Sequence, residues 1–74
     1  MEKRDEELIR SLIDRDVELR DHYFAHEDFE RQLARLDAKQ HLSVEEEVER
    51  KRLQKLKLAG KDRIMEILAR HRPH

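Results

Sequence analysis

The sequence predicts an all-α protein: two long helices in an antiparallel, coiled-coil-like hairpin that associates with a second copy into a four-helix bundle. Three observations predict this fold. Apolar residues recur at spacings of three, four and seven, which is the period of one helix face. The 74 residues include only one glycine and one proline, and 47% are charged, a composition typical of long solvated helices. The 17 basic and 18 acidic side chains nearly cancel, whereas disordered chains usually carry a high net charge.

The first helix is predicted over about residues 3–40. No glycine or proline interrupts residues 1–59, so nothing in the composition breaks a helix there. The apolar residues fall on one face, and several of them share a single heptad position. This stripe consists of Leu8, Leu12, Leu19, His26, Phe29, Leu33 and Leu36.

A turn is predicted at about residues 40–43, followed by the second helix at about 44–71. Ser43 and Glu46 form the pattern S-x-x-E, a capping box in which each side chain bonds to the backbone amide of the other residue. Pro73 is expected to end the helix. The apolar stripe of this helix consists of Leu53, Leu56, Gly60, Ile64 and Ile67, with Leu68 at its margin.

Charge supports a single domain over residues 1–74 in which the two helices face each other. Residues 1–40 hold 8 basic and 12 acidic side chains, and residues 41–74 hold 9 basic and 6 acidic ones. An acidic helix therefore lies against a basic one. Gly60 interrupts the second stripe, and two interpretations are open: a close approach of the helices or a local weak point, since glycine lowers helix stability.

The hairpin is expected to place His26 opposite Lys57 and near Asp62. We expect these three residues to form a polar contact that sets the register of the helices. His22 and His26 are four residues apart, a spacing that also allows two histidines to bind one metal ion. Two histidines alone make an unselective site, so packing is the favoured role and no bound metal is predicted.

An isolated hairpin of this length buries too little apolar surface to be stable. Apolar residues outside the two stripes are expected to supply the missing burial by contact with a second copy. A dimer is the simplest closed assembly, and the overhanging start of the longer first helix contributes to it. The residues predicted to form this interaction surface are Ile9, Ile13, Val17, Phe24, Leu58 and Met65.

Two segments, taken in order along the chain, together form a pattern of charged and aliphatic residues that begins with a histidine. They consist of His26, Glu27, Asp28, Phe29, Leu33, Leu36 and Asp37, and of Leu53, Lys57, Leu58, Lys61, Asp62, Arg63, Ile64, Ile67 and Leu68. This pattern resembles the YdcH-like family of small bacterial proteins, a domain of unknown function, over about residues 12–68. The chain departs from the family at Gly60, where leucine is usual, and at Phe29, which replaces an aliphatic residue. The resemblance implies a short helical hairpin in a bacterial cytoplasmic setting, and it implies no activity.

A basic run at residues 50–57 has five charges in eight residues and offers an alternative function, nucleic-acid binding. However, acidic residues 45–49 lie directly upstream, and no aromatic residue is present in the run for base stacking. A solvated face that pairs with the acidic helix is the favoured interpretation, so nucleic acid is not the expected partner.

Catalysis has no support in the sequence. There is no cysteine and no glycine-rich phosphate loop, and Ser11 and Ser43 are expected within a helix and at a cap. A hairpin is expected to offer no cavity of the few hundred cubic ångströms that a substrate needs. No apolar run is long enough to predict a membrane segment. We therefore predict a non-enzymatic protein without cofactors, which acts through self-association and an unidentified protein partner.

Overall fold

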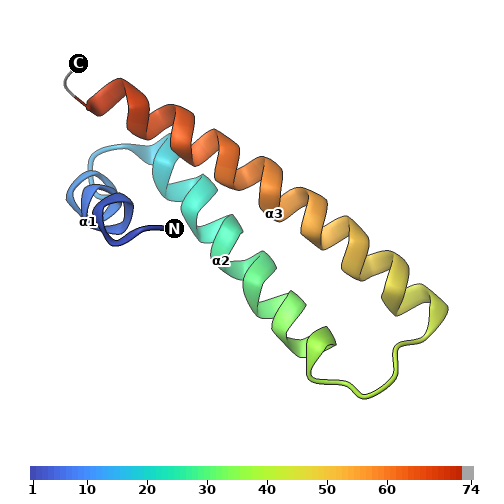
Figure 1. The fold of residues 1–74 in the computed structure, drawn as a ribbon. Helices are drawn as coiled ribbons and strands as arrows, with labels where there is room; N and C mark the ends of the chain where they lie inside the picture. Colours follow the sequence, from blue (N-terminus) through green and yellow to red (C-terminus); the bar gives the residue numbers. More distant parts are fainter. Residues whose placement is uncertain (73–74) are drawn as a thin grey trace.

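The computed structural model describes residues 1–72, and these residues form three helices and no strand: α1 (Lys3–Leu12), α2 (Val17–Asp37) and α3 (Val44–His71). The all-α class is therefore confirmed. The prediction of two helices is wrong, because the predicted first helix is divided into α1 and α2 (Figure 1).

The division occurs at residues 13–16, where the sequence contains no glycine or proline. Asp16 takes an extended conformation, and its side chain caps α2 by accepting a hydrogen bond from the amide of Leu19 at 3.0 Å. The bend has an apolar cause as well. In a straight helix Ile9 would point away from the main stripe into water, whereas the bend buries it. The local helix preference of residues 13–16 is overridden by the burial of α1.

The helices α2 and α3 lie side by side, joined by the loop at residues 38–43 (Figure 1). α1 packs against the opposite end of this pair, mainly on α3. Ion pairs accompany the packing: Arg50 bonds to Asp37 near the loop, and Arg63 bonds to Glu18 near the far end. In both pairs an acidic residue of the first half meets a basic residue of the second, as the charge division predicts.

The start of α3 carries the predicted capping box. The amide of Glu46 donates to Oγ of Ser43 at 3.1 Å, and the amide of Ser43 donates to Oε1 of Glu46 at 3.0 Å. Lys39 also bonds to the Glu46 carboxylate and lowers its pKa, together with the Ser43 amide. α3 ends at His71; Pro73, expected to stop it, lies outside the described residues.

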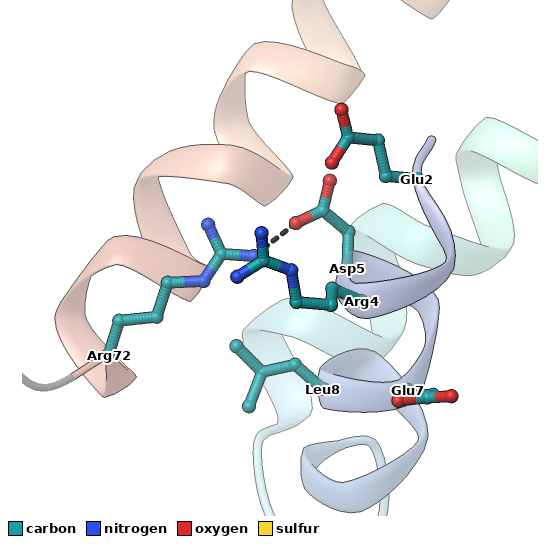
Figure 2. A pocket seen from close by; sticks show the side chains of 6 residues that line it. All are labelled: Glu2, Arg4, Asp5, Glu7, Leu8 and Arg72. Carbon is teal, nitrogen blue, oxygen red and sulfur yellow. Dashed lines mark hydrogen bonds and ion pairs between the residues drawn. The ribbon is translucent and has the colours of Figure 1, made fainter.

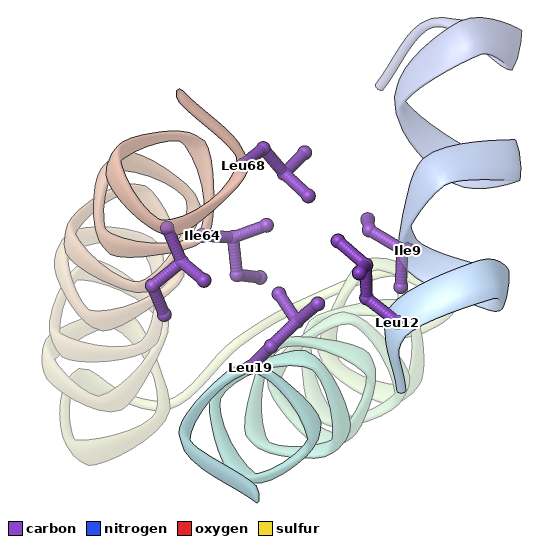
Figure 3. Close-up of a cluster of buried hydrophobic side chains, with 6 residues drawn as sticks. Ile9, Leu12, Leu19, Ile64 and Leu68 are labelled. Atoms are coloured by element: carbon purple, nitrogen blue, oxygen red, sulfur yellow. The ribbon is translucent and has the colours of Figure 1, made fainter. Parts of the chain in front are cut away.

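The main core lies where all three helices meet. Figure 3 shows Ile9 and Leu12 of α1 pointing toward Leu19, Ile64 and Leu68. Leu68 was expected at the margin of its stripe but is fully buried, because α1 covers that side of α3. Leu56, on the other side of the stripe, is exposed. Thus α1 displaces the buried face of α3 toward itself and supplies burial that a two-helix hairpin lacks.

Gly60 of α3 has open space around it. A side-chain carbon built at Gly60 would meet no atom within 4 Å, so the interpretation of a close helix approach is wrong, and the weak point remains a prediction. None of the helices formed by residues 1–72 is both long and apolar enough to cross a bilayer.

Candidate functional site

The six residues predicted to form the interaction surface do not lie on one exposed face. Ile9 is only 1% exposed and belongs to the core, so its assignment to an exposed surface is wrong. Ile13 and Met65 are partly buried against the same core. The bend before α2 is the reason, because it brings α1 onto α3 of its own chain. Val17, Phe24 and Leu58 remain well exposed.

Two exposed apolar residues were missed by the sequence analysis: Val44 and Val48 at the start of α3. At about 100° per residue they lie on the same side of the helix as Leu58, opposite the buried Leu53. Their spacing of four, and the distance of fourteen from Val44 to Leu58, could have revealed this second stripe. Together with Val17 and Phe24 of α2, these residues define the exposed apolar set, each between 54% and 76% exposed.

His26 is buried between α2 and α3, with 5% of its surface exposed. Its Nδ1 lies 3.2 Å from Oε1 of Glu30, one turn along the same helix, whereas its Nε2 is buried without a hydrogen-bond partner. Burial lowers the pKa of His26; Glu30 opposes this effect, and the positive charges of Lys57 and Lys61 add to it. His26 is therefore a packing residue held in its neutral form.

Among the described residues, His26 forms no hydrogen bond or ion pair with Lys57 or Asp62, so the predicted polar contact of these three residues is wrong. Lys57 is half-buried and its charge acts on His26. Asp62 is exposed and takes no part in this contact, because it lies nine residues after Leu53, half a turn around α3 from the buried face. Counting helical angles from Leu53 would have placed Asp62 in solvent.

His22 is half-buried on the same helix as His26. Within residues 1–72 there is no group of three or more histidine, cysteine, aspartate or glutamate side chains that could hold a metal ion. Asp62 of the facing helix is exposed and lies half a turn from the buried face of α3, so it does not add a third ligand to this pair. The two histidines are thus not brought into a metal site by the fold.

The basic run at residues 50–57 is partly neutralised by neighbouring carboxylates. Arg50 donates to Asp37 at 2.7 Å, and Arg52 forms two hydrogen bonds with Glu49. Lys51 and Lys55 point outward among the exposed apolar residues of α3. This arrangement corresponds to the solvated, paired face that the sequence analysis favours.

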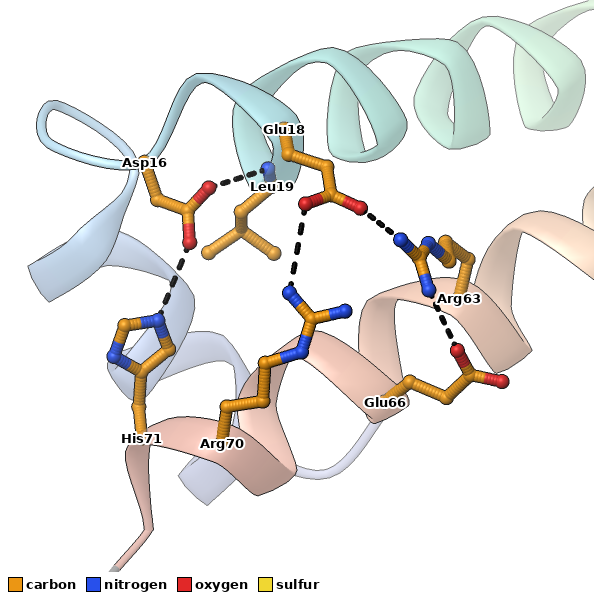
Figure 4. Close-up of polar contacts among 7 residues, drawn as sticks. All are labelled: Asp16, Glu18, Leu19, Arg63, Glu66, Arg70 and His71. Atoms are coloured by element: carbon orange, nitrogen blue, oxygen red, sulfur yellow. Dashed lines mark hydrogen bonds and ion pairs between the residues drawn. The ribbon is translucent and has the colours of Figure 1, made fainter.

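A network of polar contacts ties the start of α2 to the end of α3 (Figure 4). Glu18 is central, because its two carboxylate oxygens bond to Arg63 and to Arg70, the latter at 3.5 Å. Arg63 also bonds to Glu66 at 2.8 Å, which raises the pKa of its guanidinium further. The network holds the two helices together next to the site where α1 docks.

Asp16 connects this network to the bend. Besides capping α2, its second carboxylate oxygen lies 3.2 Å from Nε2 of His71. The hydrogen bond from the Leu19 amide lowers the pKa of Asp16, and the bond with His71 lowers it further. The carboxylate that fixes the bend is therefore also bound to the end of α3.

α1 creates a surface hollow of about 530 Å³ between itself and the residue after α3 (Figure 2). The expectation that the fold offers no such volume is wrong, and not only beside α1, because a second open hollow of about 490 Å³ lies between α2 and α3. Asp5, which is almost buried, bonds across the hollow to Arg72. The other lining residues, Glu2, Arg4, Glu7 and Leu8, all come from α1 or its start. The hollow is an open, charged notch beside a docked helix.

Comparison of the chain with models of protein families, with curated proteins and with solved structures finds no match.

Proposed function

We propose that this protein is a non-enzymatic helical interaction protein that associates first with a second copy of itself and then with a protein partner. The observation that carries the proposal is the exposed apolar set: Val17, Phe24, Val44, Val48 and Leu58. Val17 and Phe24 share the outer side of α2, and Val44, Val48 and Leu58 share the outer side of α3; grouped exposed apolar side chains of this kind support contact with another protein. Phe24 is the strongest anchor among them, since aromatic residues dominate binding energies at interfaces.

In the proposed assembly, α2 and α3 form an antiparallel coiled-coil-like hairpin, and two such hairpins form a helical bundle. The contacts at both ends of the pair support this arrangement: Asp37 bonds to Arg50 and Glu18 bonds to Arg63. The proposal includes membership of the YdcH-like family and a cytoplasmic setting, both of which follow from the resemblance described above.

The hydrogen bonds of the two serines support a non-enzymatic role. Ser11 donates its hydroxyl to the carbonyl of Leu8 at 2.7 Å, and Ser43 uses its hydroxyl oxygen to cap α3. Neither hydroxyl is paired with a histidine base, which nucleophilic catalysis by serine requires. His26, the buried histidine, bonds instead to Glu30.

The test is the dependence of molecular mass on concentration, measured by sedimentation velocity. The unmodified chain is expected to shift from monomer to dimer as its concentration rises, and Phe24→Ser is expected to weaken the dimer at least tenfold, as hot-spot residues do. Arg35→Ser is the matched control, because Arg35 is an exposed polar residue of the same helix about three turns away from Phe24, and its replacement should leave the dimer intact. A chain that stays monomeric at every concentration would overturn the proposal.

A further inference from the structure

The junction between α1 and α2 is short and close to helical. Ile13 keeps the right-handed helical conformation, with φ of −60° and ψ of −30°. The amides of Arg15 and Asp16 both donate to the carbonyl of Leu12 at 2.9 Å. Asp16 then departs into an extended conformation, with φ of −116° and ψ of 100°. A change of Asp16 from this extended conformation to the helical one, mainly in ψ, would turn α1 and α2 into one continuous helix.

The sequence is compatible with that straight form. The junction has no glycine or proline, and Leu12, Leu19, His26 and Leu33 follow one another at intervals of seven across it. An unbroken heptad stripe is a property of a single long helix. The same sequence is therefore compatible with two conformations: the bent one that the structure shows, and the straight one that its heptad periodicity favours.

The bent form covers an apolar groove at the end of the α2 and α3 pair. Leu19, Ile64, Ile67 and Leu68 line this groove and are fully buried beneath α1 (Figure 3). When α1 straightens, it projects away from its own groove, and the groove and Ile9 are both left in water. The structure identifies what fits the groove: the apolar face of an α1 helix, with Asp5 placed to bond to Arg72.

We propose that the protein dimerises by exchange of α1, with the α1 helix of each copy occupying the groove of the other. This inference rests on the proposed self-association and adds a second contact surface, the α1 groove, to the exposed apolar set. Every contact of α1 is remade between chains, and the two contacts are identical, as a twofold dimer requires. The bent monomer is then the closed form, in which each chain blocks its own groove.

The first test locks the bend with Val17→Pro. Val17 is the first residue of α2, where proline fits because the amide there has no acceptor within the helix. Asp16 already has the extended conformation that a residue before proline prefers. In a continuous helix the same proline would clash with the preceding turn, which disfavours the straight form by roughly a hundredfold. The control is Val17→Ala, which removes the same exposed side chain without fixing the bend, and Val17→Pro is expected to dimerise roughly a hundredfold more weakly than this control.

The second test exchanges the charges of the ion pair that joins α1 to the end of α3. Asp5→Arg and Arg72→Asp each place like charges together, whether α1 docks within a chain or between two copies of the same variant. When the two variants are mixed, α1 exchange pairs opposite charges at both docking sites of the mixed dimer. We expect the mixture, measured by native mass spectrometry, to contain more mixed dimer than the half that random pairing gives.

The outcomes separate this inference from the proposed function. If Val17→Pro dimerises as well as Val17→Ala, and the charge variants pair at random, α1 exchange is overturned while self-association stands. If the unmodified chain never dimerises, both fail. Circular dichroism of each variant establishes that it keeps its helices, so that a monomer formed by Val17→Pro is a folded one.

Discussion

Replacement of Ile9 by alanine tests the position of α1 in the monomer directly, because in a single chain Ile9 is buried only when α1 folds back onto α3. The change removes three carbon atoms from a side chain that is 1% exposed and packs in the core with Leu19 and Ile64. At about 0.8 kcal/mol for each buried carbon, the loss of burial amounts to about 2.4 kcal/mol, to which the cavity left behind adds. The better helix propensity of alanine returns a few tenths of a kcal/mol.

We therefore expect Ile9→Ala to lower the free energy of unfolding by about 2–3 kcal/mol. This corresponds to a decrease in melting temperature of about 10–20 °C for a domain of this size. The assay is urea unfolding followed by far-ultraviolet circular dichroism, at a concentration low enough to keep the protein monomeric. One transition is expected, because the core cluster takes residues from all three helices.

The control is Val48→Ala, in which an exposed side chain of α3 is shortened. It should change the free energy of unfolding by no more than about 0.5 kcal/mol. If residues 3–40 formed a single straight helix in the monomer, Ile9 would be in water and its replacement would resemble this control. Equal effects of the two substitutions would refute the fold-back of α1.

Three further predictions follow from α3 and from the buried histidine. Gly60→Ala should raise the free energy of unfolding by about 0.5–1 kcal/mol in thermal melts, because alanine is the better helix former and the added carbon meets no neighbour. Ser43→Ala should lower it by about 0.5–2 kcal/mol through loss of the cap, whereas Ser11→Ala, on an exposed helix face, should have a smaller effect. For His26, the folded pKa lies below the ordinary value of 6.5, so only the unfolded chain takes up a proton as the pH falls below that value. Urea unfolding should accordingly show stability that is complete above about pH 6.5 and declines below it, with a smaller decline in His26→Leu.

The sequence predicted those parts of the fold that depend on local pattern. The Ser43 and Glu46 capping box was visible because both of its partners lie within four residues. The buried positions of Leu19, Leu33, Leu53 and Ile64 followed from helical periodicity. The division of acidic and basic halves was visible as well, and it reappears in the contacts of Glu18 and Asp37 with α3.

The bend at Asp16 could not be predicted in the same way. Besides the Asp16 cap, its cause is the contact of Ile9 and Leu12 with Ile64, Ile67 and Leu68, more than fifty residues away, and helical periodicity carries no information about that contact. Residues 13–16 themselves have no strong helix breaker, so only the polar triplet of Asp14, Arg15 and Asp16 hinted at a boundary. The error in α1 then led to the wrong assignment of Ile9 to the exposed surface.

The position of the α1 groove has a consequence for synthesis of the chain. α1 is synthesised before the residues that cover it, because Ile64 to Leu68 lie more than fifty positions later in the sequence. Because the chain is synthesised at roughly 5–20 residues per second, Ile9 and Leu12 stay exposed to solvent for several seconds before the residues that bury them are made. During that interval the α1 segment of a nascent chain is not covered by α3. Neighbouring ribosomes on one messenger RNA would hold several such chains close together. Under the proposed exchange of α1, pairing of copies would then be favoured during translation over pairing of finished, closed monomers.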